Sequence, residues 1–137
     1  MLLTRREFVA GTAACCACGL LGGCIAVNPA PTFEVGADHT LPLPKELAEA
    51  GSQVKVRLPG TDSLVLVWRT KGGFGAASIT CTHRGSEVRF NPKEETLDCP
   101  SHGSRFTPDG VILEGPARKP LRAYPAEQQG DRLKVMG

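Results

Sequence analysis

The chain has 137 residues, a formal net charge of +2, and five phenylalanines, one tryptophan and one tyrosine. This length fits one domain with a modest core, and the near balance of charge excludes the strongly basic profile of a nucleic-acid-binding protein. Sixteen glycines and eleven prolines between short apolar runs predict short strands joined by turns rather than long amphipathic helices.

Residues 1–23 differ in character from the rest of the chain. Thr4-Arg5-Arg6-Glu7-Phe8-Val9 precedes an uncharged apolar stretch at 8–21, an order that resembles the twin-arginine export motif. The alternative is a chance pair of arginines in an ordinary signal peptide. The twin-arginine route carries proteins that are already folded, so we expect it for a domain that folds before export. Residues 1–23 are therefore predicted to be an export signal.

The end of this signal suggests how the protein is held at a membrane. Leu21-Gly22-Gly23-Cys24 resembles a bacterial lipobox, which implies lipid attachment at Cys24 and a flexible linker over 24–36. The alternative is an uncleaved helical anchor over 8–27, which has about the length of a bilayer-spanning helix, although its four glycines weaken it. With either tether, we expect the protein to lie at the periplasmic face of the bacterial inner membrane.

Residues 37–137 are expected to form one all-β domain. A short helix is predicted at 43–50, where Pro44 lies near the start and is tolerated. Polar and apolar residues alternate at 52–58, which is typical of a half-buried strand. The strand expected at 63–70 contains the continuous apolar run Leu64-Val65-Leu66-Val67-Trp68, which predicts a central strand. Further strands are expected at 74–80, 95–98, 104–107, 111–113, 121–124 and 132–135.

Two short clusters in this domain carry the chemistry. They are Cys81-Thr82-His83 and, after fifteen intervening residues, Cys99-Pro100-Ser101-His102. Two thiolates and two imidazoles make four metal ligands, which suit either a tetrahedral zinc ion or a [2Fe-2S] cluster with mixed ligation. Cys81 and Cys99 are the only cysteines in 37–137. Exported domains often contain disulfides, but this one has no cysteines other than these two. We expect this if both thiols bind a metal.

The residues around these ligands resemble the Rieske [2Fe-2S] family. The resemblance implies an all-β fold of Rieske-type antiparallel sheets, with two cluster-binding loops and a proline loop. It also implies that both cysteines hold the buried iron and both histidines the outer one. A structural zinc module is the alternative that the four ligands alone permit. The matching segments are Cys81-Thr82-His83-Arg84-Gly85, Cys99-Pro100-Ser101-His102-Gly103-Ser104-Arg105-Phe106 and Gly115-Pro116-Ala117.

Several neighbouring positions bear on the reduction potential. In high-potential family members a serine at the position of Ser104 donates to a bridging sulfide, and a tyrosine stands where this chain has Phe106. Pro116 belongs to the loop that covers the cluster. We expect an intermediate potential within the family range of about −150 to +300 mV, unless Ser104 and Phe106 serve only in packing. Ser86 and Ser101 stand where Rieske proteins of cytochrome bc complexes have two disulfide-bonded cysteines.

The resemblance implies a protein that passes single electrons between redox partners, such as a cytochrome or a membrane quinol-oxidising subunit. The alternative within the family is a Rieske small subunit of a multi-subunit oxidoreductase such as arsenite oxidase. No nucleic-acid partner is expected. Several basic residues near the ligand loops indicate either a surface for an acidic redox partner or ordinary solvated charges. They are Arg84, Arg105, Arg118, Lys119 and Arg122.

Overall fold

The computed structural model describes residues 27–137, so the predicted export motif with Arg5 and Arg6 and the predicted lipid site Cys24 lie outside the described residues. Within 27–137, no helix is both long and apolar enough to cross a membrane. The described elements are β1 (Thr32–Glu34), β2 (Thr40–Pro42), the 3-10 helix η1 (Lys45–Leu47), β3 (Gln53–Arg57), β4 (Leu64–Arg69), β5 (Phe74–Ser78), β6 (Arg89–Asn91), β7 (Thr96–Asp98), β8 (Arg105–Phe106), β9 (Ile112–Glu114), β10 (Ala126–Gln129) and β11 (Arg132–Val135).

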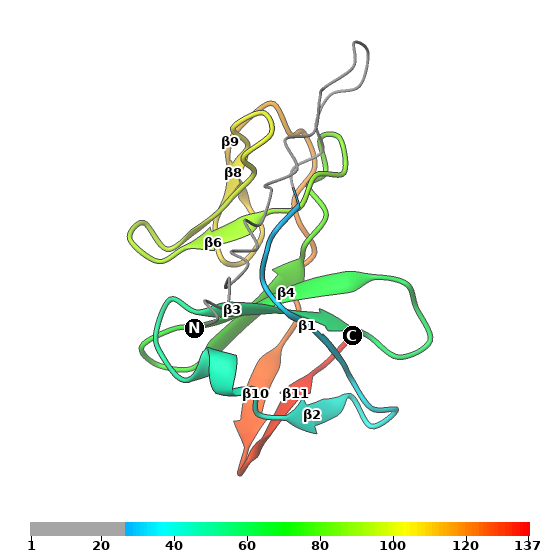
Figure 1. Ribbon diagram of the computed structural model, residues 1–137. Helices are drawn as coiled ribbons and strands as arrows, with labels where there is room; N and C mark the ends of the chain where they lie inside the picture. Colours follow the sequence, from blue (N-terminus) through cyan, green and yellow to red (C-terminus); the bar gives the residue numbers. More distant parts are fainter. Residues whose placement is uncertain (1–26) are drawn as a thin grey trace, which may run out of the picture.

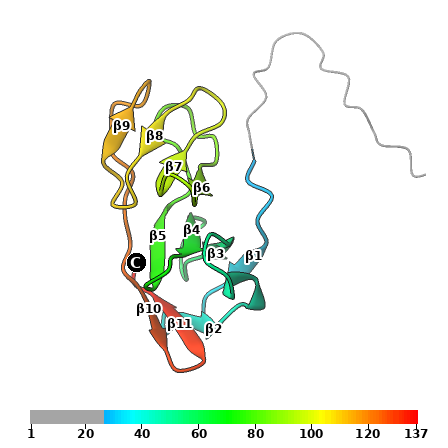
Figure 2. The same cartoon turned by 90° about the vertical axis from the view of Figure 1, so that its left-hand side faces the viewer.

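The strands form three sheets, in the orders β1-β3-β4-β5, β10-β11-β2 and β6-β7-β8-β9. The β6–β9 sheet makes one end of the molecule, and the other two sheets pack together at the opposite end (Figures 1 and 2). Neighbouring strands pair antiparallel except for β1, which runs parallel to β3. The predicted all-β fold class is confirmed.

Strand β4 lies at the centre of the molecule and separates two apolar cores. Val65 and Val67 face the core shared with β2, β3 and β11, whereas Leu66 and Trp68 face the core beneath the ligand loops. All four side chains are fully buried. Because successive side chains of a strand point to opposite faces, a strand covered on both faces needs an unbroken apolar run. The predicted central strand is confirmed.

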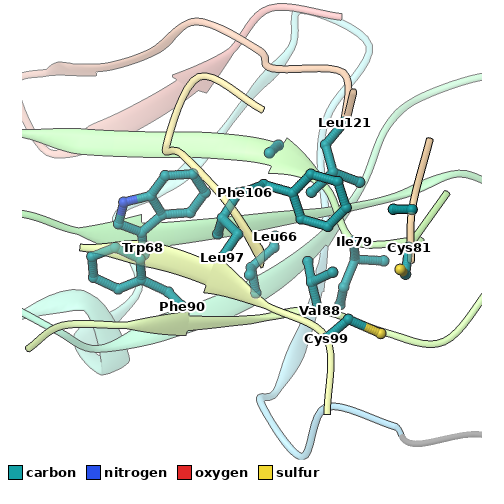
Figure 3. Close-up of a cluster of buried hydrophobic side chains, with 12 residues drawn as sticks. Leu66, Trp68, Ile79, Cys81, Val88, Phe90, Leu97, Cys99, Phe106 and Leu121 are labelled. Carbon is teal, nitrogen blue, oxygen red and sulfur yellow. The ribbon is translucent and has the colours of Figure 1, made fainter. Parts of the chain in front are cut away.

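The second of these cores connects the sheets to the ligand loops (Figure 3). The Trp68 ring stacks on Phe90 with centroids 5.1 Å apart. Gly75 on β5 pairs with Trp68, and a Cβ atom there would come within 2.3 Å of the indole ring. The strand therefore requires a glycine at this position. Cys81 and Cys99 lie at the end of the core away from Trp68.

The sequence prediction did not include the short strands β1, β2, β6 and β10, and two of the predicted elements differ in form. The helix predicted at 43–50 is a single 3-10 turn, η1, with only Leu47 buried. The strand predicted at 121–124 is an extended segment along β5 with one isolated bridge, Ala77 to Ala123, and the regular strand is β10, which follows it. Pro120 and Pro125 flank the segment, and because proline has no N–H group, it limits a continuous hydrogen-bond ladder.

The segment predicted as a flexible linker, 24–36, is attached to the domain where the structure describes it. Asn28 is 2% exposed, and β1 within the same segment pairs with β3. Lys55 Nζ donates to the backbone oxygen of Asn28 over 2.8 Å. The composition of this segment suggested flexibility, but hydrogen bonds to residues distant in sequence hold the backbone and side chain of Asn28 in place.

Candidate metal centre

The first ligand loop, residues 81–86, follows β5 after two residues. The backbone N–H of Cys81 donates to the Ser86 oxygen over 2.7 Å, and the Gly85 N–H donates back to the Cys81 oxygen over 3.0 Å. Gly85 has φ +81°, in the left-handed region that favours glycine. These bonds close a tight turn in which Cys81 is buried and His83 is half-buried.

The second ligand loop, residues 99–104, follows β7 and repeats this backbone pattern. The Cys99 N–H donates to the Ser104 oxygen over 2.8 Å, and the Gly103 N–H donates to the Cys99 oxygen over 3.0 Å. Gly103 also has φ +81°. The two loops are thus the same turn built twice. The histidine stands at the third position of loop 81–86 and at the fourth position of loop 99–104, where His102 is exposed.

The two thiols converge inside the molecule. Cys81 and Cys99 are each 2% exposed and form no disulfide. Burial raises the pKa of the Cys99 thiol, and the adjacent Cys81 raises it further, while the N–H groups of Ser101 and His102 that bond to its sulfur act in the opposite direction. A metal ion that binds both sulfurs as thiolates would offset the desolvation that now keeps this thiol protonated.

The two imidazoles converge outside the thiols. The His83 and His102 rings meet edge to face with centroids 4.8 Å apart. His83 Nδ1 is buried and has no hydrogen-bond partner in residues 27–137. Burial lowers the pKa of His83, and repulsion from His102 and then Arg84 lowers it further. Neutral imidazole is the form that binds metal, and an unpartnered buried ring nitrogen is a candidate ligand atom.

The donor set fits a two-iron cluster. A sulfur pair lies inside and a nitrogen pair lies outside, so each of two metal ions can take two protein ligands of one kind. Across residues 27–137, no group of three or more His, Cys, Asp or Glu side chains is arranged to hold a metal ion. The structure brings Cys81 and Cys99 together as one pair and His83 and His102 together as another.

The proline loop, residues 115–120, is fastened to both ligand loops. The Ala117 N–H donates to Ser104 Oγ over 3.0 Å, and Ser104 is fully buried. Thr82 Oγ1 donates to the backbone oxygen of Lys119 over 2.6 Å. Pro116 is exposed at the tip of this loop, after a cis peptide bond. The contact made by Thr82 carries no signal in the sequence, because its partner is a backbone oxygen 37 residues away.

Phe106 is fully buried in the core that contains both ligand cysteines. Its backbone lies on β8, directly after the second ligand loop, and Figure 3 shows its ring within this core near Ile79 and Leu121. The predicted neighbours Ser104, Phe106 and Pro116 therefore lie in or beside the three loops that form the site.

A family model described as "Rieske [2Fe-2S] domain" matches residues 39–125. Cytochrome b6-f complex iron-sulfur subunit 1 of Synechocystis is 35% identical over 95 residues, covering 61% of this chain and 53% of that protein. The chain spans about half or less of the length of the curated relatives that it matches.

Two solved structures are similar over most of their own length. The crystal structure of the plasma membrane Rieske protein PetC3 from Synechocystis has a TM-score of 0.52 and 29% identity, covering 62% of this chain and 86% of that one. A chain in the complex of reduced oxygenase and oxidized ferredoxin in carbazole 1,9a-dioxygenase has a TM-score of 0.61 and 25% identity, covering 73% of this chain and 94% of that one.

Proposed function

Because the chain belongs to the Rieske [2Fe-2S] domain family, whose model matches residues 39–125, we propose that it transfers single electrons between redox partners. The cofactor is a Rieske-type [2Fe-2S] cluster, which takes up and releases one electron when bound. The four ligands are Cys81 and Cys99 for the inner iron and His83 and His102 for the outer one. The observation that carries this proposal is that the two ligand loops bring Cys81 and Cys99 together as a buried pair and His83 and His102 together as a more exposed pair.

The chain's own residues set the direction of electron entry. Cys81 and Cys99 lie in the apolar core, where water is excluded, whereas His102 is exposed at the surface. A partner therefore approaches the histidine side. A histidine that binds iron through one ring nitrogen keeps the other for a proton, so His83 and His102 can couple proton movement to electron transfer.

The location is proposed from the sequence at the N-terminus. The Arg5-Arg6 motif supports export as a folded protein, and Cys24 supports a lipid anchor, with an uncleaved helix as the other form of tether. The partners that fit such a tethered carrier at the periplasmic face are a cytochrome and a membrane subunit that oxidises quinol. A relative described as a plasma membrane Rieske protein is consistent with this placement.

A second candidate is a Rieske subunit that works inside a multi-subunit oxidoreductase, as in arsenite oxidase. It is supported by several relatives described as iron-sulfur subunits of cytochrome b6-f complexes. Purification of the tagged full-length chain from its native membrane separates the two candidates. A large subunit that remains bound in constant ratio favours the subunit role, and a chain that purifies alone favours the free carrier.

The decisive experiment is electron paramagnetic resonance of the dithionite-reduced full-length protein, with analysis of iron, zinc and acid-labile sulfide. We expect a Rieske-type signal and about two irons per chain. Cys81→Ser and His83→Ala should both abolish the signal. His39→Gln is the matched control, because His39 is the only other histidine of the chain. A silent, colourless protein with about one zinc per chain would instead establish the zinc module and overturn the proposal.

A further inference from the structure

The structure separates the five cations near the ligand loops into two groups. Arg105 contacts Asp98 on β7, Glu114 on β9 and Glu94 in the turn between β6 and β7. Arg122 lies over the Tyr124 ring, 4.9 Å from its centroid. The other three cations are exposed and form no ion pair with any residue of 27–137; they are Arg84, Arg118 and Lys119.

Two of these unpaired cations border a cleft beside a predicted cluster ligand. The cleft has a volume of about 370 Å³ and is lined by Thr82, His83, Pro116, Arg118 and Lys119. We call it the His83 cleft. The hydrogen bond from Thr82 Oγ1 to the Lys119 backbone oxygen joins its two walls, so the cleft is part of the fold rather than a gap between free loops.

The charge around the His83 cleft has one sign. The ligand loops 81–86 and 99–104 and the proline loop 115–120 contain no aspartate or glutamate. Other cations of the domain do have acidic partners, for example Arg57 with Glu34 and Lys55 with Glu87. Unpaired charges of one sign around a recess next to an electron entry point are typical of a surface that steers a partner of opposite charge.

We propose that the His83 cleft is the docking site for the acidic face of a protein electron-transfer partner, with a partner carboxylate placed between Arg118 and Lys119. The inference rests on the proposed electron-transfer function. It commits to a protein rather than to an anionic membrane surface, because a membrane over this cleft would cover the histidine side through which electrons enter. The docked partner would bring its redox centre close to His83.

The test is stopped-flow oxidation of the reduced, full-length holoprotein by two redox proteins of opposite charge, over a series of salt concentrations. The probes are plastocyanin with an acidic surface and basic cytochrome c. The variant is Arg118→Glu/Lys119→Glu. The matched control is Lys45→Glu/Lys71→Glu, which changes the net charge equally at exposed residues of the opposite end that form no ion pair within 27–137.

At low salt, the Arg118 and Lys119 reversal should slow oxidation by plastocyanin about tenfold and speed oxidation by cytochrome c, and both effects should vanish at high salt. The control should change either rate by less than about twofold. Equal effects of variant and control would overturn the inference. So would a variant that loses binding to phosphatidylglycerol vesicles but reacts with plastocyanin at the unaltered rate, since that would make the cleft a membrane site.

The same samples distinguish this inference from the proposed function. If the unaltered protein has no Rieske-type paramagnetic signal, the proposed function fails and the docking inference fails with it. If the signal and the reaction with both probes are present but the rates do not depend on Arg118 and Lys119, only the docking inference fails.

Discussion

The Ser101 hydroxyl donates a hydrogen bond to the Ser86 hydroxyl over 2.7 Å and joins the two ligand loops across 15 positions of sequence. Ser86 is 3% exposed and Ser101 is half-buried, so the bond is partly shielded from water. This chain departs here from the Rieske proteins of cytochrome bc complexes, which have two disulfide-bonded cysteines at these positions. In this chain a hydrogen bond occupies the place of that covalent connection, which keeps the loops in register but leaves them easier to separate.

Removal of either hydroxyl should destabilise the holoprotein. We expect Ser86→Ala and Ser101→Ala each to lower the free energy of unfolding by about 1 kcal/mol, and the double variant to lose less than the sum. Denaturant unfolding followed by circular dichroism measures this. The control is Ser63→Ala, at an exposed serine whose side chain makes no hydrogen bond within 27–137. Strictly additive losses would show that the two hydroxyls do not interact.

The proximity of Ser86 and Ser101 also predicts that a disulfide can be engineered between these positions. Because the two Oγ atoms are within hydrogen-bond distance, the pair Ser86→Cys/Ser101→Cys should form a disulfide in an oxidising environment. Closing a loop of this length should stabilise the domain by about 3 kcal/mol. Thiol titration measures whether the disulfide forms, and thermal unfolding with and without reductant measures how much it stabilises the domain. Two thiols that stay reactive under oxidising conditions would contradict the observed proximity of the loops.

Ser104 is expected to act on both stability and potential. Ser104→Ala removes the acceptor for the buried Ala117 N–H, which should lower the free energy of unfolding by about 1–3 kcal/mol. Because its oxygen already accepts from Ala117, the Ser104 hydroxyl retains its proton to donate to the cluster. Its loss should therefore also make the midpoint potential more negative, as measured by redox titration. Ser86→Ala, which leaves the Ala117 bond intact, is the control; equal potential shifts in both would assign the effect to general loosening.

Substitution of Phe106 by tyrosine is expected to raise the midpoint potential, the opposite of the effect expected for Ser104→Ala. Phe106→Tyr adds a hydroxyl to a ring in the same buried core as the ligand cysteines. If the hydroxyl donates to a cysteine sulfur, a preference of about 1.4 kcal/mol for the reduced cluster raises the one-electron potential by about 60 mV. Protein-film voltammetry measures the shift. Phe90→Tyr, in the same core but stacked on Trp68, is the control. An unchanged potential in a folded Phe106→Tyr protein would remove this position from the control of potential.

The attachment of the N-terminal segment is also testable. The Asn28 side-chain amide donates to Gln53 Oε1 over 3.1 Å and to the Val88 oxygen over 3.0 Å, and its backbone N–H donates to Glu87 Oε2 over 2.6 Å. Asn28→Ala should therefore lower the free energy of unfolding by about 1–3 kcal/mol, because it leaves buried groups without partners. Limited proteolysis should then cut near residue 30. Thr32→Ala, at an exposed position, is the control, and equal protease resistance in both variants would contradict a fastened segment.

Local patterns were enough to predict most of the longer strands and to propose the ligands, but they did not indicate the short strands β1, β2, β6 and β10. The apolar run at 64–68 identified β4 because burial on both faces leaves no polar alternation, and the ligand loops could be read because their cysteines, histidines and glycines lie within a few residues of one another. The prediction was poorer at 121–124 and 24–36. There the conformation depends on hydrogen bonds to β5 and to Gln53, Glu87 and Val88, which are distant in sequence.

By itself, the sequence determined the β class of the fold and the candidate donor atoms, because side-chain alternation and ligand chemistry are local properties. Only the tertiary structure decided how the donors pair and which charges remain unpaired. Arg105 and Arg118 look alike in the sequence, yet Arg105 meets the carboxylates of Glu94, Asp98 and Glu114, whereas Arg118 meets none within 27–137. Such a difference depends on which distant groups the fold brings within a few ångströms, where Coulomb and hydrogen-bond energies become significant.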